Sequence, residues 1–255
     1  MVNILKMNEL TEDEMTRYNR QMMLQNWETK GQLKLKNSKV AVIGAGGLGS
    51  PVSLYLAAAG IGSITIIDND VLELSNLNRQ VIYSTEDINK SKALSAKTNL
   101  EKLNPAINIV GLNVTIDNGN VDELLKGMDI IVDCLDNFET RYLINSFCER
   151  NKVPLVHGAI HAMEGRVLFI DPKNKDSPCL SCFYPENPPK MGKFPVLGST
   201  VGITGAIQAT EVIKYLTGIG TNLIGKFLII DTKMMEFRHI TIRNNPKCKV
   251  CGSEK

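Results

Sequence analysis

Residues 39–49 have the sequence Lys-Val-Ala-Val-Ile-Gly-Ala-Gly-Gly-Leu-Gly, and this stretch decides the fold. Its apolar part, Val40 to Ile43, lacks the alternation of a half-exposed strand, so it predicts a buried parallel strand. Three glycines then follow in the pattern G-x-G-x-x-G: Gly44, Gly46 and Gly49. A helix expected from about Ser50 to Ala59 and a strand at Ser63 to Ile67 complete a βαβ unit. In that setting the glycines indicate a turn that holds a phosphate at the N-terminus of a helix.

The same alternation continues toward the C-terminus. Further helices are expected at 92–103, 121–126, 139–151 and 200–216, and further strands at 107–114, 129–135, 154–157, 165–171, 226–231 and 237–243. The chain therefore predicts an α/β fold with a Rossmann-like, doubly wound, mostly parallel sheet that antiparallel strands extend. We expect a single domain over residues 1–255, with a helical arm over about 10–36, a nucleotide-binding half over about 37–160 and a C-terminal half over about 161–255.

The helical arm begins with a capping box. Thr11-Glu-Asp-Glu14 predicts that Thr11 caps a helix running to about Gln25. Arg17-Tyr-Asn-Arg20 makes this first helix unusually polar and basic.

Composition excludes several classes of protein. Hydrophobic residues make up 43% and charged residues 22% of the 255 residues, and the formal net charge is +2. So small a charge does not suggest nucleic acid or an anionic membrane as a partner. No apolar run reaches the roughly 18 residues that a membrane span needs. Met1 to Glu14 does not resemble a signal peptide, so we expect a cytoplasmic protein with reduced thiols.

Four of the six cysteines form two C-x-x-C pairs, Cys179/Cys182 and Cys248/Cys251. Each pair lets one short turn direct two sulfurs at one metal, and four thiolates complete a tetrahedral zinc site. Such a site has no open position for water, so the predicted zinc is structural. The alternatives are disulfide bonds or a thioredoxin-like redox pair.

Charged residues gather beyond the glycine turn. Asp68 ends the second strand, where a carboxylate accepts the hydroxyls of a ribose. Arg79 and Lys92 suit a triphosphate, while the strand at 129–135 places Asp133 and Asp136 at its carboxyl end, where a carboxylate suits Mg²⁺. These residues favour ATP over a dinucleotide, although an NAD-binding oxidoreductase stays as an alternative.

Several motifs occur together in one order from about Leu10 to Gly252: Arg17-Tyr-Asn-Arg-Gln, Gly44-Ala-Gly-Gly-Leu-Gly, Asp68-Asn-Asp, Ser75-Asn-Leu-Asn-Arg-Gln, Asp133-Cys-Leu-Asp-Asn and the paired C-x-x-C. In this combination the chain resembles the MoeB/ThiF group of adenylyltransferases in the ubiquitin-activating-enzyme superfamily. The resemblance implies a homodimer that uses ATP to adenylate the C-terminal Gly-Gly carboxylate of a small ubiquitin-like sulfur carrier of the MoaD/ThiS type. The pathway would be molybdopterin synthesis, thiamine synthesis or tRNA thiolation, and the half at about 161–255 would hold the zinc and the carrier.

The resemblance also implies roles for individual residues. Gly47 would lie against the nucleotide, Asp136 would coordinate Mg²⁺, and Arg20 would reach the ATP of the partner subunit. The residues implied to act in catalysis are Arg20, Arg79, Lys92 and Asp136. Those implied to bind the nucleotide are Gly44, Gly46, Gly47, Asp68, Ser75, Asn76, Leu77, Asn78, Arg79, Lys92, Asp136 and Asn137.

The chain departs from many relatives in the loop from Pro185 to Gly198. That loop contains no cysteine to accept a carrier, and Met191 stands near the expected place. Cys134 and Cys148 lie in apolar surroundings, which predicts core residues. Sulfur would therefore come from a separate donor protein.

Two other hypotheses about function stay open. The protein could be a member of the superfamily that adenylates a different carboxylate, on modified tRNA or on a peptide. It could also be a scaffold whose nucleotide site is degenerate.

His157 and His161 flank a predicted Gly-Ala-Ile turn and are expected to be polar residues at a strand end, although a catalytic role is the alternative.

Overall fold

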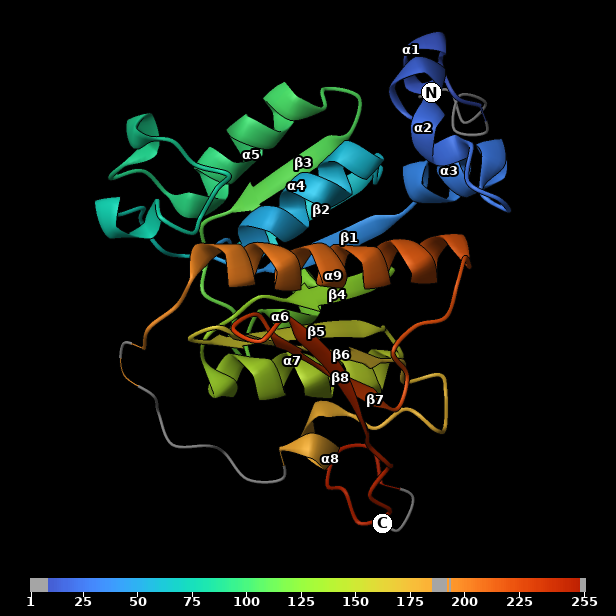
Figure 1. The fold of residues 1–255 in the computed structure, drawn as a ribbon, viewed down its shortest axis with the longest axis vertical. Coiled ribbons are helices and arrows are strands. Elements are labelled where there is room, and N and C mark those ends of the chain that lie inside the picture. The colour runs from blue at the N-terminus through green and yellow to red at the C-terminus, as the bar shows by residue number, and fades with distance from the viewer. Residues whose placement is uncertain (1–8, 185–191, 193, 253–255) are drawn as a thin grey trace.

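The computed structural model describes residues 9–184, 192 and 194–252. These residues form one sheet of eight strands with helices packed around it (Figure 1). Its strands are β1 (Lys39–Ile43), β2 (Ser63–Ile67), β3 (Asn108–Leu112), β4 (Ile130–Asp133), β5 (Leu155–His161), β6 (Glu164–Ile170), β7 (Lys226–Asp231) and β8 (Glu236–Thr241). Their spatial order is β3-β2-β1-β4-β5-β6-β7-β8. The first five run parallel, and β6, β7 and β8 continue the sheet antiparallel. The predicted fold class, including the antiparallel extension, is confirmed.

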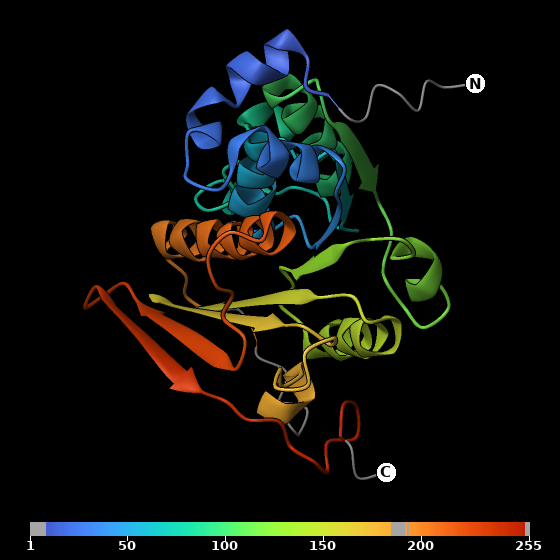
Figure 2. The same cartoon turned by 90° about the vertical axis from the view of Figure 1, so that its right-hand side faces the viewer.

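Helices cover both faces of the sheet. The described helices are α1 (Glu12–Arg17), α2 (Asn19–Met22), α3 (Glu28–Lys36), α4 (Gly49–Ala59), α5 (Lys92–Leu103), α6 (Val121–Leu124), α7 (Phe138–Asn151), α8 (Leu180–Phe183) and α9 (Gly198–Thr217). Figure 2 shows α9 on one side of the sheet and α7 on the other. None of these helices is both long and apolar enough to cross a membrane.

Two hydrophobic cores follow from the alternation of side chains along each strand. Val40 and Val42 of β1 face a core that includes residues of α3, α4, α5 and α9. Ala41 and Ile43 face the opposite core, which includes residues of α6, α7 and α8. These four side chains are fully buried, and only Lys39 at the start of β1 is exposed. The strand is apolar without alternation because helices cover it on both faces.

The turn from β1 to α4 depends on two glycines. Gly44 has a φ of +91°, a conformation that L side chains rarely adopt. A Cβ atom on Gly49 would lie 1.9 Å from the carbonyl oxygen of Gly44, so only glycine allows the helix to start this close to the strand. The predicted G-x-G-x-x-G turn is therefore present, and it sets the position of the first turn of α4.

The helical arm differs from the expectation. The capping box at Thr11 is present, with the Thr11 hydroxyl 3.2 Å from the Glu14 amide and the Glu14 carboxylate 2.8 Å from the Thr11 amide. The single helix to Gln25 is wrong, because α1 ends at Arg17 and α2 starts at Asn19. Tyr18 breaks the helix: its side chain is buried, and its hydroxyl accepts a 2.8 Å hydrogen bond from Asn104.

The region around His157 also differs. The expected Gly-Ala-Ile turn is wrong, since residues 158–160 continue β5 and pair with β6. Ala162, with a φ of +54°, is where the chain reverses between the two strands.

We predict that Gly49→Ala destabilises the protein, because the added methyl group must displace the backbone of Gly44. The expected loss is about 3 kcal/mol, or roughly 6–12 °C in Tm for a chain of this size. Scanning calorimetry gives the Tm. Gly202→Ala is the matched control, because a Cβ there meets nothing within 4 Å and the residue lies inside α9. Equal Tm values for the two variants would contradict the steric account of the turn.

Candidate nucleotide site and cysteine cluster

The carboxyl ends of β1, β2 and β4 lie level with one another. Ile43, the last residue of β1, pairs with Ile67 of β2 and with Asp133 of β4. The segments that leave these strands therefore begin side by side at one edge of the sheet. This edge is where open α/β sheets bind ligands.

The glycine turn leaves room for a ligand at its centre. A Cβ on Gly46 would have no neighbour closer than 3.7 Å, whereas one on Gly47 would press against a Val201 methyl group at 3.0 Å, so the open space lies at Gly46. No side chain caps the N-terminus of α4. The amides of Ser50 and Val52 already donate to the carbonyls of Gly46 and Leu48, and Pro51 has no N–H, so this helix end offers an anion its partial positive charge rather than a row of free amides.

Asp68 is fixed between the glycine turn and its own strand. One carboxylate oxygen accepts from the amide of Ala45 at 2.7 Å, and the other accepts from the amide of Asp70 at 2.8 Å. Burial raises the pKa of Asp68, and the two amide bonds and the charge of Lys92 oppose that effect in part. The carboxylate is thus held at the sheet edge beside the glycine turn.

Lys92 lies at the start of α5 with its ammonium group close to the same edge. Its Nζ atom pairs with Asp70 at 2.8 Å, and its side chain is only 8% exposed. Tyr83 connects this helix to the glycine turn, because its hydroxyl donates to the carbonyls of Ala45 at 2.8 Å and of Lys92 at 3.1 Å. Burial raises the pKa of Tyr83, so the hydroxyl stays protonated as the donor.

The segment from Ser75 to Arg79 begins in a short 3-10 helix, Leu74–Asn76. Asn76 is buried, and its side-chain oxygen accepts from the amide of Glu73 at 3.1 Å. The Arg79 guanidinium donates to Ser75 and Asn78, both at 3.0 Å. A Cβ on Gly47 would lie 3.8 Å from the Arg79 side chain, so Arg79 lies beside the glycine turn.

Two features place the N-terminus of α9 at the same site. A Cβ on Gly198 would lie 2.4 Å from the carbonyl oxygen of Asn78, and Val201 approaches Gly47. Leu77 separates Asn78, which makes this contact, from the buried Asn76. The preceding loop comes to the site here, but residues 185–191 and 193, including Met191, lie outside the described residues.

Asp136 and Asn137 follow β4. Asp136 is exposed, and within the described residues its carboxylate has no hydrogen-bond or ion-pair partner. The Asn137 side chain accepts from the amide of Thr140 at 2.9 Å and so caps α7. Asp136 is therefore a free carboxylate at the edge, whereas the oxygen of Asn137 is engaged by the helix.

Asp133 does not face the ligand edge, although it ends β4 as expected. It is fully buried with His157, whose Nδ1 lies 2.6 Å from its carboxylate, and with Arg141, whose Nε lies 3.3 Å away. Burial would raise the pKa of Asp133, but the Arg141 charge and the His157 hydrogen bond hold it below its usual value. Burial and Arg141 lower the pKa of His157, so the imidazole is neutral and donates through Nδ1. His161, in contrast, is exposed and stacks on Phe194 at 5.9 Å.

Arg20 belongs to α2, and this helix lies at the end of the sheet opposite to the carboxyl ends of β1 and β2 (Figure 1). Its neighbour Gln21 donates to Ala59 at the C-terminal end of α4, and Arg17 donates to Leu103 at the C-terminal end of α5. The candidate site lies at the N-terminal ends of the same two helices. Within one chain the structure therefore does not bring Arg20 together with Arg79, Lys92 and Asp136.

The four cysteines of the C-x-x-C pairs form one cluster at the far end of the molecule. All four sulfurs lie within 4.8 Å of one another, with separations of 4.0, 3.6 and 3.3 Å among neighbouring pairs. A tetrahedral zinc ion with Zn–S bonds of about 2.3 Å requires about 3.8 Å between sulfurs. All six cysteines, each within the described residues, are free thiols. The geometry therefore fits zinc and excludes disulfides between these pairs.

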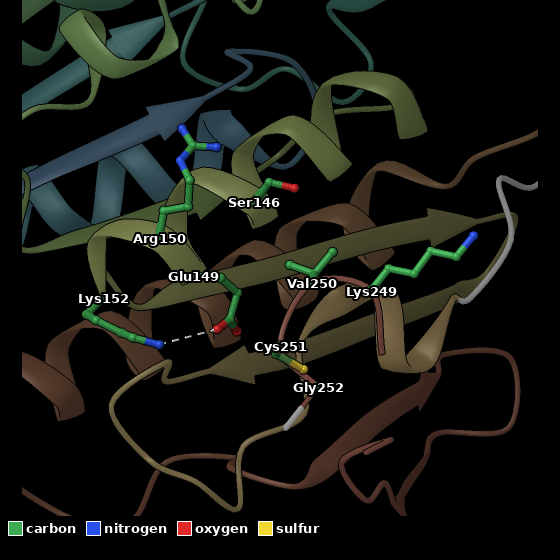
Figure 3. Close-up of a pocket in the computed structure, with 8 residues that line it drawn as sticks. All are labelled: Ser146, Glu149, Arg150, Lys152, Lys249, Val250, Cys251 and Gly252. Atoms are coloured by element: carbon green, nitrogen blue, oxygen red, sulfur yellow. Dashed lines mark ion pairs between the residues drawn. The ribbon is translucent and has the colours of Figure 1, made fainter. Parts of the chain in front are cut away.

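Two cavities lie outside the nucleotide edge. One of about 470 Å³ adjoins the cysteine cluster, between the end of α7 and the turn that carries Cys251 (Figure 3). The other, of about 460 Å³, lies at the β5–β6 turn and is lined by residues that include His161 and Arg166. There Ala162 donates to Pro195 and accepts from Leu197, at 2.9 and 3.1 Å. The second cavity therefore lies beside the segment that leads into α9.

Sequence reasoning missed three residues of the site. Tyr83 joins the glycine turn to α5, Asp70 pairs with Lys92, and Arg141 holds the segment before Asp136. Asp70 stood in a motif without a stated role. Tyr83 and Arg141 act through backbone carbonyls that are distant in sequence, and such contacts leave no local pattern.

The chain is similar to known adenylating proteins over nearly all its length. A sulfur carrier protein adenylyltransferase from Thermus thermophilus is 42% identical over 253 residues, covering 96% of this chain and 93% of the relative. A molybdopterin-synthase adenylyltransferase from Escherichia coli is 38% identical over 248 residues, covering 96% of this chain and 100% of the relative. The solved structure of E. coli MccB with ATP superimposes with a TM-score of 0.79 at 27% identity, covering 92% of this chain and 74% of that one.

The match to a protein family agrees with these relatives and with the glycine turn, the charged sheet edge and the four-cysteine cluster. The model of the ThiF family matches residues 18–250. The chain therefore belongs to the ThiF family.

Proposed function

We propose that the protein uses ATP to adenylate the C-terminal glycine carboxylate of a small ubiquitin-like sulfur carrier protein. The observation that carries this proposal is the set of groups at one sheet edge. A glycine turn with an uncapped helix, the fixed carboxylate of Asp68, the ammonium group of Lys92 and the free carboxylate of Asp136 lie there together. Relatives of about the same length are named adenylyltransferases that act on sulfur carriers or molybdopterin synthase.

Different residues of the site would contact the phosphates and the ribose of the nucleotide. Gly44, Gly46 and Gly47 allow the backbone to approach the phosphates, and Asp68 would accept the ribose hydroxyls. The phosphates would be held by Asn76, Arg79 and Lys92, with Ser75, Leu77 and Asn78 forming the wall between them. Lys92 now pairs with Asp70, so a bound triphosphate would share its ammonium group with that carboxylate.

Asp136 would hold Mg²⁺ with Asn137 beside it, and the ion would neutralise charge on the phosphates. Carboxylate and water oxygens are the ligands that Mg²⁺ prefers, and a free carboxylate at the phosphate end of the site fits that chemistry. The residues would then position the glycine carboxylate for attack on the α-phosphorus while pyrophosphate leaves. No general base is needed, because a terminal carboxyl group with a pKa of about 3.5 is already ionised at neutral pH.

The carrier would reach the site along the C-terminal half of the chain. The cavity at the β5–β6 turn lies beside residues 194–197, which lead into the N-terminus of α9 at the glycine turn. An extended Gly-Gly tail could follow this route, since it has no side chains at its last two positions.

The sulfur would come from a separate donor protein. Four of the six cysteines lie in the cluster, and the other two, Cys134 and Cys148, are buried. Burial raises the pKa of both buried thiols, which keeps them protonated and unreactive. We therefore place the end of this chain's reaction at the acyl-adenylate.

We further propose that the four cysteines bind one structural zinc ion and that the chain acts as a single adenylation domain in a cytoplasmic homodimer. Four free thiols whose sulfurs all lie within 4.8 Å of one another are the donor set of such a site. The zinc would join the C-terminal turn to α8, which contains Cys182 and has Cys179 at its N-cap.

The direct test of the proposed function is ATP–pyrophosphate exchange. We expect exchange only with a carrier that ends in Gly-Gly, and we expect it to vanish when the last glycine is removed. Exchange driven by a peptide or a modified tRNA in place of every carrier would contradict the proposed substrate. Binding of NADH without binding of MgATP would contradict the nucleotide assignment.

Asp136→Ala should reduce exchange by roughly 100-fold or more, because it removes the proposed Mg²⁺ ligand at the leaving pyrophosphate. Its Tm should stay close to that of the unaltered protein, since the side chain is exposed and unpaired within the described residues. Glu139→Ala is the control, an exposed carboxylate in the first turn of α7. Near-normal ATP–pyrophosphate exchange by Asp136→Ala would contradict the proposal that Asp136 holds Mg²⁺.

Replacing Cys248 with serine should abolish zinc binding and lower the Tm, because one of four thiolates is lost. Elemental analysis is expected to give about one zinc per chain for the unaltered protein. Lys249→Ala, an exposed change between the two ligands of the same turn, should keep the metal. Equal zinc content in Cys248→Ser would contradict the site.

If Arg20 of each subunit completes the site of the other subunit in a homodimer, two inactive variants should restore activity when they are mixed. Mixed Arg20→Ala and Asp136→Ala proteins, each inactive alone, should form hybrids with one intact site. With random pairing the mixture should recover about a quarter of the unaltered activity, because half of the dimers carry one working site out of two. No recovery after subunit exchange, shown by native mass spectrometry, would mean that Arg20 does not act across the dimer.

A further inference from the structure

The backbone just before Asp136 is held by two buried side chains. Asp133 accepts a 3.0 Å hydrogen bond from the amide of Leu135, and Arg141 donates to the carbonyl of the same Leu135. Both backbone polar groups of Leu135 are thus engaged, one in each of the two peptide bonds that flank its Cα atom. The carbonyl held by Arg141 belongs to the peptide bond that leads into Asp136, so this contact restrains the orientation of that peptide.

Arg141 also ties this segment to the next strand. The nitrogen that donates to Leu135 lies 2.9 Å from the carbonyl of Gly158 in β5. The Asp133 carboxylate and His157 complete the arrangement, and all three side chains are at least 95% buried. On the other side of Asp136, Asn137 caps α7. The residue between these two anchors is Asp136, which is exposed and has no partner in the described part of the chain.

Such a cluster is not explained by stability alone. Burying ion pairs carries a desolvation penalty that often equals or exceeds their attraction. The buried Nε2 atom of His157 has no hydrogen-bond partner among the residues that the structure describes, which is a further unfavourable feature. Gln208 of α9 donates to the backbone carbonyl of Asp133 at 3.0 Å. The helix whose N-terminus lies at the glycine turn therefore also contacts this cluster.

We propose that Asp133, Arg141 and His157 form a positioning cluster that sets the direction of the Asp136 carboxylate and thereby the affinity of the site for Mg²⁺. This inference rests on the proposed function, because it needs Asp136 to hold the metal. The three residues touch neither nucleotide nor metal. They act through the Leu135 peptide, as residues that orient metal ligands do in other proteins.

Arg141→Lys separates positioning from charge balance. A lysine keeps a positive charge beside Asp133, but its single ammonium group lacks the planar fork that spans Asp133, Leu135 and Gly158. The readout is binding of the fluorescent analogue mant-ATP to the full-length protein as Mg²⁺ is titrated, which needs no carrier. We expect the Mg²⁺ midpoint to rise roughly 10- to 100-fold, the range typical for residues behind metal ligands, with little change in mant-ATP binding at saturating Mg²⁺.

Arg150→Lys is the matched control on the same helix. It lies at the far end of α7 and pairs with Asp122 on the surface. Its Mg²⁺ midpoint should equal that of the unaltered protein. An unchanged midpoint for Arg141→Lys, alongside a large shift for Asp136→Ala, would overturn the inference and leave the proposed function intact. No shift for Asp136→Ala itself would overturn both.

A second variant covers the case in which Arg141→Lys does not fold. The double change Asp133→Asn with Arg141→Gln removes both buried charges at once and keeps groups that form hydrogen bonds. It should fold and show the same rise in the Mg²⁺ midpoint. A purely structural role would lower the Tm and the amount of active protein without moving this midpoint, and that result would contradict the inference.

Discussion

The close approach of Gly49 to the carbonyl of Gly44 is the constraint on which the site depends. It lets α4 start directly at the end of β1, where a side chain would collide at 1.9 Å. The uncapped end of α4 then lies at the sheet edge, beside Asp68, which accepts from Ala45 in the same turn. Parallel pairing of β1 with β2 and β4 at one level adds the segment of Asp136. The glycine turn, Asp68 and the segment of Asp136 are thereby brought to one edge of the sheet.

Much of the fold could be predicted because it depends on local pattern. The apolar runs, the glycine turn, the capping box at Thr11 and the two cysteine pairs each carry a signal within a few residues, and β7 falls where it was expected. The break at Tyr18 could not be predicted, because the residues that bury this side chain and donate to its hydroxyl, such as Asn104 at a distance of 86 residues, are remote in the sequence. The burial of Asp133 could not be predicted either, since it depends on Arg141 and His157 from two other elements.

Helix α7 connects the two chemical centres of the molecule. Its first turn follows Asp136, and Asn137 caps it. Its last turns form one wall of the cavity beside the cysteine cluster, where Glu149 and Cys251 lie across from each other (Figure 3). Arg141, between them, donates to the carbonyl of Leu135 just before Asp136. A zinc ion in the cysteine cluster would thus stabilise the end of the helix whose other end follows Asp136.

The residues at this sheet edge are proposed to transfer an adenylyl group from ATP to the terminal carboxylate of a carrier. Intact-mass spectrometry of a Gly-Gly carrier, after incubation with the protein and MgATP, tests this proposal most directly. We expect the carrier to gain the mass of one adenylyl group on its last glycine, with release of pyrophosphate. Formation of ADP and phosphate with an unchanged carrier mass would contradict it, because the nucleotide would then be cleaved at the wrong phosphorus.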